Sequence, residues 1–346
     1  MINLRSDTVT RPSDAMREAA RDAEVGDDVH RQDPTVAELE ARAADVVGTE
    51  AALFVPSGTM GNQIAVRVHT ERGEELLCDR RSHVVKWELA GAAQLAGVQT
   101  RTLDFADGVP TPEQVTENVQ GAGSHAAGTG LLALENSHND RGGLAVPLAD
   151  VAAAADAAHD AGVPVHLDGA RLFNAAAALG VDAADLVDRV DSVMFCLSKG
   201  LGAPVGSMLA GSATFVERAR RVRKLLGGGM RQAGVVAAPG LLALENRHRL
   251  ADDHERARRL AAGLDAVEGL SVPTPETNLV YVDSSSVELP ATALVDACEG
   301  RGVEAGAAGE YRTRFCTHLD VDDDDVAAAT ERVGRAVADA QTSGST

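Results

Sequence analysis

The sequence predicts an α/β fold divided into two domains. The chain has 346 residues, more than the roughly 100–200 residues of one typical domain. Hydrophobic residues make up 45% and charged residues 24%, which is the composition of a globular protein rather than a disordered one. Short aliphatic runs alternate with alanine-rich stretches of helical spacing, as strands and helices do in this fold class.

The larger domain is predicted from alternating strands and helices. The strands are short, mostly aliphatic runs at 52–55, 75–78, 131–135, 163–167, 192–197 and 205–210. The helices have apolar residues at helical spacing and cover 35–47, 61–69, 148–161 and 213–226.

The smaller domain follows a long, arginine-rich helix that is predicted over 239–263. After it come a strand at 278–282, a helix at 291–301, a strand at 313–317 and a final helix from Asp322. The change of pattern places a boundary near residue 246. We therefore expect a larger domain of residues 1–246, with an N-terminal arm over 1–12, and a smaller domain of residues 247–346.

The charge balance excludes some partners. Asp and Glu number 52 and Lys and Arg 32, so the formal charge is −20, and the lysines are only Lys86, Lys199 and Lys224. Nucleic acids and anionic membranes both need a basic face, so neither is an expected partner. Scarce lysine and abundant acid favour a halophilic source, where salt screens the repulsion; the alternative is an acidic protein from an ordinary environment.

The cysteines and the apolar stretches indicate a cytoplasmic protein. Cys78, Cys196, Cys298 and Cys316 show no paired spacing, as expected of reduced thiols. The charged N-terminus does not resemble a secretory signal. The longest apolar stretch, 233–244, contains proline and glycine and is shorter than the ~18 residues of a membrane span.

A candidate phosphate-binding turn lies at Val55-Pro-Ser-Gly-Thr-Met-Gly-Asn62, between a strand and a helix. Exposed N–H groups, hydroxyls and the helix dipole favour an anion there. The turn matches neither nucleotide-binding glycine motif, so a nucleotide is not implied. The structural alternative is a plain Ser or Thr cap on a tight turn.

A strand-end acid and a strand-end lysine are the next candidates. Asp168 ends an apolar strand, where it is either a helix cap or the partner of a protonated ring nitrogen in a cofactor. Lys199 ends another apolar strand, and a lysine there is costly unless its charge is paired or its pKa falls. A lysine of lowered pKa is what Schiff-base chemistry requires, so we interpret Lys199 as functional.

A triple glycine, 227–229, precedes Arg231. It is either a flexible loop or a place where backbone approaches a ligand or a neighbouring subunit, with Arg231 binding an anion. A phosphate-binding turn, a strand-end Asp and a strand-end Lys occur in the order that binds pyridoxal phosphate in fold-type-I enzymes. His83, shortly after the strand at 75–78, could stack on such a cofactor; alone it would be taken as structural.

Seven segments resemble one family, the low-specificity L-threonine aldolases. They are Arg5-Ser-Asp-Thr-Val-Thr-Arg-Pro12, Glu24-Val-Gly-Asp-Asp-Val29, Asp33-Pro-Thr35, Phe54-Val-Pro-Ser-Gly-Thr-Met-Gly-Asn62, His166-Leu-Asp-Gly-Ala-Arg171, Ser192-Val-Met-Phe-Cys-Leu-Ser-Lys-Gly200 and Leu226-Gly-Gly-Gly-Met-Arg-Gln-Ala-Gly234. The resemblance is collinear from residue 2 to about residue 340. It implies a fold-type-I enzyme with a mixed, mainly parallel seven-stranded sheet flanked by helices, and a smaller C-terminal α+β domain.

The resemblance also implies the reaction and the cofactor site. The reaction is retro-aldol cleavage of L-threonine or L-allo-threonine to glycine and acetaldehyde, dependent on pyridoxal 5′-phosphate and without a metal. Lys199 would carry the cofactor as a Schiff base and Asp168 would pair with its ring nitrogen. His83 would stack on the ring and is the expected base, directly or through a water. The phosphate would bind Ser57, Gly58 and Thr59, helped by Arg231 of a partner subunit.

Further residues are implied around the substrate. Ser6, Arg171 and Arg314 would bind the carboxylate of the amino acid, with Arg171 beside the cofactor and Lys224 near that carboxylate or across an interface. His125 would be a second group near the substrate hydroxyl. His30 stands where the family usually has tyrosine, in a loop expected near the substrate. Because Arg231 is expected to act in a neighbouring site, the protein is expected to be at least a dimer, and the family suggests a tetramer.

Three other functions compete with the aldolase. Another pyridoxal phosphate enzyme is the nearest: a serine hydroxymethyltransferase-like enzyme, a β-eliminating lyase or an aminotransferase. A cofactor-free aldolase would use Lys199 directly on a ketone. A binding protein that has lost activity would be expected to lack Lys199 or Asp168, and both are present.

Overall fold

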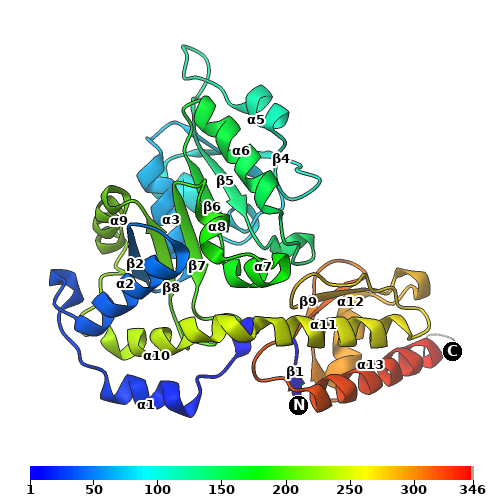
Figure 1. Cartoon of the computed structure of the whole chain (residues 1–346). Coiled ribbons are helices and arrows are strands. Elements are labelled where there is room, and N and C mark those ends of the chain that lie inside the picture. Colours follow the sequence, from blue (N-terminus) through cyan, green and yellow to red (C-terminus); the bar gives the residue numbers. More distant parts are fainter. Residues whose placement is uncertain (344–346) are drawn as a thin grey trace. The chain divides into compact units, whose positions relative to one another are not determined.

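The computed structural model describes residues 1–343 and divides into two compact units. The larger unit is Pro12–Arg247. Its seven-stranded sheet has the order β2-β8-β7-β6-β5-β3-β4 (Figure 1). The strands are β2 (Ala51–Val55), β3 (Glu75–Asp79), β4 (Gln99–Leu103), β5 (Thr129–Glu135), β6 (Val165–Asp168), β7 (Ser192–Cys196) and β8 (Ser207–Gly211).

The sheet is mixed and mainly parallel, which confirms the predicted fold class. The strands β4, β3, β5, β6 and β7 run parallel to one another, whereas β8 runs antiparallel to both β7 and β2. Every residue of β3, β5, β6, β7 and β8 is buried, as expected for strands of a sheet that is covered by helices on both faces.

Helices cover both faces of this sheet. In Figure 1, α6 (Leu148–Asp160) and α8 (Ala183–Val187) cover the near face, and α3 (Gly58–His69) lies on the far face. The remaining helices of this unit are α1 (Asp14–Asp22), α2 (Pro34–Val47), α4 (His83–Lys86), α5 (Pro112–Asn118), α7 (Leu172–Leu179), α9 (Ala213–Leu225) and α10 (Gly234–Glu245).

The prediction of one helix over 239–263 was wrong. A 3₁₀ turn, Asn246–Arg249, separates α10 from α11 (Leu250–Asp265). At this turn the Asn246 side chain donates to the Leu201 carbonyl, and its backbone N–H bonds to the Ala243 carbonyl three residues earlier. The tightened backbone ends α10 before the second unit begins.

The smaller unit is made of Met1–Arg11 and the chain from His248 on. It has the α+β architecture that was predicted. A three-stranded antiparallel sheet contains β11 (Gly306–Ala307), β12 (Arg312–Cys316) and β9 (Leu279–Asp283), accompanied by α11, α12 (Ala291–Glu299) and α13 (Asp323–Ser343). The N-terminal arm belongs to this unit, not to the larger one with which we had grouped it, because β1 (Ile2–Asn3) pairs in parallel with β10 (Val303–Glu304).

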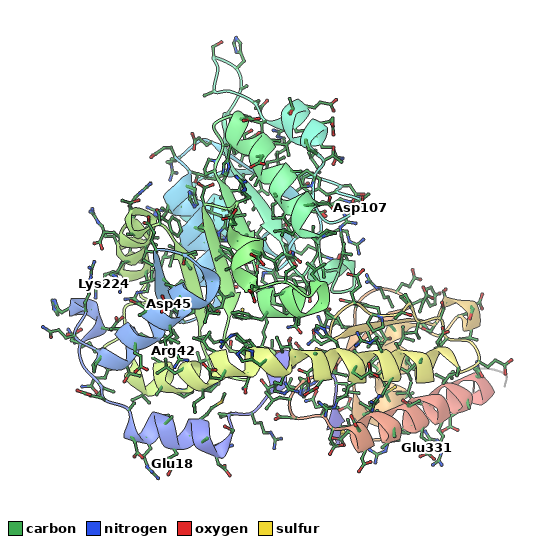
Figure 2. All side chains as sticks on the ribbon, viewed as in Figure 1. Glu18, Arg42, Asp45, Asp107, Lys224 and Glu331 are labelled. Atoms are coloured by element: carbon green, nitrogen blue, oxygen red, sulfur yellow. The ribbon has the colours of Figure 1, made fainter. Side chains whose placement is uncertain are left out.

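None of the helices within residues 1–343 has both the length and the apolar character that spanning a membrane requires. Exposed carboxylates are spread over both units instead. Figure 2 labels Glu18, Asp45, Asp107 and Glu331 among them, and all four are exposed.

Candidate active site

The candidate active site lies at the carboxyl edge of the parallel strands. Strands β3, β5, β6 and β7 all end at this edge, because they are parallel neighbours in the sheet. Glu135 at the end of β5 is in register with Asp168 at the end of β6. His83 follows β3 and Lys199 follows β7, so this edge gathers an imidazole, two carboxylates and an amine.

Asp168 ends β6 as a buried carboxylate that is 5% exposed. Its Oδ1 accepts from the Ala170 amide at 3.1 Å and its Oδ2 from Asn62 Nδ2 at 2.8 Å. Both donors are neutral, so the negative charge of Asp168 is available to a cationic ring nitrogen. A helix-cap role alone would not require the second bond, which comes from a distant part of the chain.

His83 is fixed at this edge through both its backbone and its ring. Its N–H donates to Glu135 Oε2 at 2.7 Å, and its Nδ1 lies 2.9 Å from Glu88 Oε1. One ring nitrogen of His83 and one carboxylate oxygen each of Glu88 and Asp168 all lie within 4.8 Å of one another. Desolvation lowers the pKa of His83, but the Glu88 hydrogen bond and the charges of Asp168 and Glu88 together raise it above its usual value.

The same three residues have donor atoms close enough for a metal ion. Their hydrogen bonds argue for another use. The Asn62 amide donates to both carboxylates, and the His83 ring nitrogen already pairs with Glu88. These atoms are therefore engaged with one another.

Lys199 is half-buried beyond the end of β7, close enough for its charge to act on His83. The turn from β2 to α3 lies against the same strand end. A Cβ at Gly58 would come within 3.1 Å of both Cys196 Sγ and the Met194 side chain, so glycine lets the N-terminus of α3 approach β7. Ser57 caps α3 by accepting from the Met60 amide at 3.2 Å, and Ser57 and Thr59 are exposed. The start of α3, with Ser57, Gly58 and Thr59, thus lies against β7, the strand that Lys199 follows.

Arg171 begins the helix after β6 and is 6% exposed. Its guanidinium donates to Asn139 Oδ1 at 3.0 Å. Asn139 follows β5, and its own amide N–H donates to Glu135 Oε1 at 2.9 Å. Arg171 is therefore held at the same edge as Asp168.

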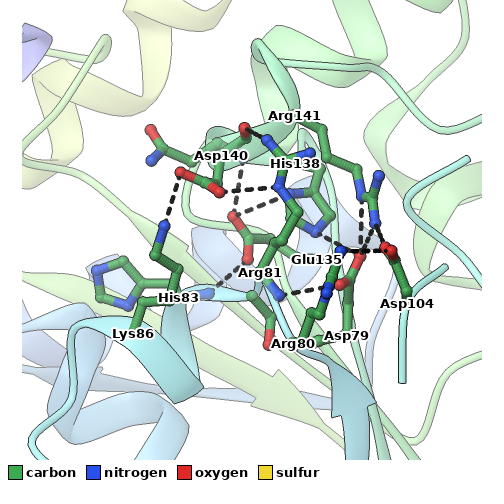
Figure 3. Close-up of polar contacts among 12 residues, drawn as sticks. Asp79, Arg80, Arg81, His83, Lys86, Asp104, Glu135, His138, Asp140 and Arg141 are labelled. Carbon is green, nitrogen blue, oxygen red and sulfur yellow. Dashed lines mark hydrogen bonds and ion pairs between the residues drawn. The ribbon is translucent and has the colours of Figure 1, made fainter. Parts of the chain in front are cut away.

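A polar network, partly buried, supports the loops at this edge (Figure 3). Glu135 reaches from β5 to the His83 backbone, and Asp140 pairs with Arg81 at 2.9 Å and with Lys86 at 3.0 Å. Arg141 binds Asp79 at 2.7 Å. Burial raises the pKa of Glu135. These contacts join the segment that carries His83 to the loop after β5.

Several predicted residues do not join this group within the larger unit. His125 is exposed in the loop that precedes β5, which is at the amino edge of the sheet, opposite Asp168. His30 and Lys224 are exposed, at the end of a short 3₁₀ turn and in the last turn of α9. Arg231 is 80% exposed and lies 3.4 Å from Asp27.

Ser6 and Arg314 belong to the smaller unit. Ser6 is buried, and its hydroxyl accepts from the Thr8 amide at 3.3 Å. Arg314 donates to the carbonyl of Arg5 at 3.0 Å. The two predicted carboxylate-binding residues are thus adjacent in that unit, since Arg5 and Ser6 are consecutive.

Sequence reasoning missed Glu88, Asn62 and His166 as members of the site. His166 could have been found, because residues two apart in a strand share a face and place it beside Asp168. Asn62 was considered only as the last residue of the candidate phosphate-binding turn, whereas it lies in α3. Glu88 carried no signal, since the irregular backbone after α4 decides where it points; Leu89 and Ala90 both have positive φ.

Comparison with known proteins identifies the family of this chain. The beta-eliminating lyase family matches residues 3–286. A probable low-specificity L-threonine aldolase 2 of Arabidopsis thaliana is 44% identical and covers 94% of each chain. The low specificity L-threonine aldolase of Escherichia coli K12 is 43% identical over 93% of this chain and 95% of its own.

The fold is likewise shared with a solved threonine aldolase. The structure of Leishmania major threonine aldolase matches with a TM-score of 0.81 at 18% identity, covering 97% of this chain and 99% of that one. This likeness establishes the fold, and the closer sequence relatives establish the family. The chain belongs to the beta-eliminating lyase family and, within it, to the low-specificity L-threonine aldolases.

Proposed function

We propose that this protein binds pyridoxal 5′-phosphate and cleaves L-threonine and L-allo-threonine to glycine and acetaldehyde. The observation that carries the proposal is the gathering of Asp168, Lys199 and His83 at one strand edge. Membership in the aldolase family supports the same reaction.

The residues present suit this cofactor. The amine of Lys199 would hold its aldehyde carbon, and the Asp168 carboxylate would meet a protonated ring nitrogen, since its present donors are neutral. The phosphate would take the exposed N–H groups and hydroxyls at the start of α3, a position that suits an anion. When bound, the cofactor would accept the electron pair that the breaking Cα–Cβ bond releases.

The protein's own part is to align the substrate and move a proton. In the net reaction the O–H and Cα–Cβ bonds of the substrate break, the C=O bond of acetaldehyde forms, and Cα gains a hydrogen. The His83 ring would accept the hydroxyl proton at the nitrogen that does not face Glu88. Arg171 would bind the carboxylate, because a guanidinium matches it in shape and charge.

The active protein is proposed to be a homo-oligomer, at least a dimer and by family resemblance a tetramer. Arg231 is exposed in one chain, which suits a residue that binds phosphate in a neighbouring chain. Any role of His125 near the substrate would also need a second chain, because it lies at the opposite edge of its own sheet. Four free, buried cysteines and the charge of −20 support a cytoplasmic protein of a salt-rich cell.

The scarcity of lysine makes the cofactor assignment directly testable. Borohydride reduction of the protein with bound pyridoxal phosphate would fix the cofactor to whichever lysine carries it, and there are only three. Peptide mass mapping should find the label on Lys199. Lys224→Arg is the matched control and should label like the parent. Label on Lys86 or Lys224, or no label on protein that is shown to be folded, would contradict the proposal.

A further inference from the structure

A chain of buried hydrogen bonds behind the site converges on Asp168 and Glu88. It begins at His69, whose Nε2 lies 2.8 Å from Ser192 Oγ. Ser192 Oγ in turn lies 2.9 Å from His166 Nδ1, and His166 Nε2 lies 3.1 Å from Asn62 Oδ1. Ser192 and His166 are buried.

The protonation of this chain can be assigned from its chemistry. Burial lowers the pKa of His69 to about 4 and that of His166 to about 3, so both rings are neutral near pH 7. The Asn62 oxygen can only accept, so His166 Nε2 carries the hydrogen and its Nδ1 accepts from Ser192. Every hydrogen in the chain therefore points toward Asn62.

Asn62 links this chain of hydrogen bonds to two carboxylates. Its amide group, which is 1% exposed, donates to Asp168 Oδ2 and to Glu88 Oε1, each at 2.8 Å. Glu88 Oε2 also accepts from Gln63 Nε2 at 2.6 Å. Both carboxylates are thus stabilised as anions by neutral donors, and one side chain fixes their relative positions.

The remaining contact of Glu88 is His83. The side chain of Glu88 is fully buried and lies 2.9 Å from His83 Nδ1, whereas the His83 side chain is 29% exposed. Because a carboxylate only accepts, Nδ1 must carry the hydrogen. Within residues 1–343, Nε2 of His83 has no protein partner, so the nitrogen that remains able to accept is the one open to a ligand.

We propose that Glu88 is a positioning residue: it fixes His83 as the Nδ1–H form with Nε2 free, and Asn62 couples this pair to Asp168. The inference rests on the proposed function only for what Nε2 does, namely accept the substrate's hydroxyl proton. The same carboxylate would then balance the charge of the imidazolium.

The first test is on protein freed of cofactor, so that it does not depend on the proposed function. Histidine labelled with ¹⁵N reports the tautomer and the titration midpoint of each ring, and His83→Gln identifies the His83 signals. The parent protein should show His83 as the Nδ1–H tautomer with a midpoint above the ordinary value near 6.5. An Nε2–H tautomer in the parent protein would overturn the proposal whatever the variants do.

Glu88→Gln keeps the shape of the side chain and removes its charge. The His83 midpoint should fall by at least about one pH unit, because hydrogen bonds to charged groups are the stronger ones. Glu40→Gln is the matched control: Glu40 accepts from the Phe54 amide and pairs with Arg220, in a different network. The His83 midpoint should not change there. An unchanged midpoint in Glu88→Gln would refute the role of the charge.

The second test uses the loaded enzyme. The groups that face His83 are Glu88, Glu135 at its backbone, Asp168 and Lys199. If Nε2 is the base, the acid limb of kcat/KM should move to lower pH in Glu88→Gln by the same amount as the NMR midpoint. A changed midpoint with an unmoved limb would refute the catalytic part of the inference. If the parent enzyme releases no acetaldehyde, the proposed function fails, while the tautomer result stands by itself.

Discussion

Replacing Arg223 should destabilise the larger unit more than any exposed arginine would. Arg223 lies in α9 and its side chain is 2% exposed. It donates to Asp28 Oδ2 and to the Phe54 carbonyl, both at 2.7 Å. Burial lowers the pKa of Arg223 below its usual value, although the charges of Asp28 and Glu40 act in the opposite direction. Phe54 lies in β2, an edge strand, so Arg223 satisfies backbone that the sheet leaves open.

The expected loss of stability arises because Arg223→Met leaves the buried carboxylate of Asp28 without its main partner. Removing one partner of a buried ion pair costs about 3–5 kcal/mol. Arg220 lies 3.9 Å from Asp28 and would still compensate part of the negative charge of Asp28. We therefore expect a loss at the lower end of this range, about 3 kcal/mol, for Arg223→Met. In a unit of this size that lowers the thermal midpoint by roughly 6–12 °C.

Differential scanning calorimetry of the parent protein, Arg223→Met and Asp28→Leu with Arg223→Met would test this. The double variant should be more stable than the single one, because no unpaired carboxylate remains buried. The control is Arg42→Met, which breaks an exposed pair with Glu245 (Arg42 is labelled in Figure 2) and should cost less than about 1 kcal/mol. The reasoning fails if Arg223→Met matches this control, or if the double variant is less stable than the single one.

Three further outcomes are expected. The pKa of histidine is near 6.5 in the unfolded state, and that of His69 in the folded chain is about 4. The unfolded state therefore binds more protons between these values, so the contribution of His69 to stability should be complete above pH 6.5 and fall by roughly 3 kcal/mol toward pH 4, in addition to the losses from other buried histidines such as His166. His69→Gln should flatten that fall in thermal unfolding, and a parent midpoint that is constant from pH 7 to 4.5 would contradict it. Because the chain carries −20, raising KCl should raise the thermal midpoint; a midpoint that falls with salt would argue against a halophilic protein. Asp168→Asn should keep the borohydride label on lysine but lower kcat at least about 100-fold, so parent-like kcat would exclude its pairing with the ring nitrogen.

The sequence predicted strands well where burial is continuous and missed the exposed edge strand β4. Every residue of β5, β6 and β7 is buried, and the predicted ranges fall within two residues of the observed ones at every end. Strand β4, Gln-Thr-Arg-Thr-Leu, was missed because it is an edge strand in which no residue is fully buried. Polar residues are expected on the edge strand of a native sheet, but a strand made of them lacks the apolar run by which the other strands were predicted.

The site was predictable where topology alone decides position. Asp168 and Lys199 follow parallel strands that are neighbours, so their common edge follows from the order of elements. The same rule, applied to His125, would have placed it at the other edge, since it precedes β5. Glu88 was not predictable, because its contact with His83 depends on loop backbone with positive φ at the two residues that follow.

The most direct test of the central claim is acetaldehyde release from L-threonine and from L-allo-threonine, measured by a coupled dehydrogenase in high salt with pyridoxal phosphate present. The parent protein should release acetaldehyde and glycine in equal amounts from at least one isomer, and Lys199→Ala should release none. A protein that carries the label on Lys199 but releases no acetaldehyde from either isomer would contradict the aldolase assignment.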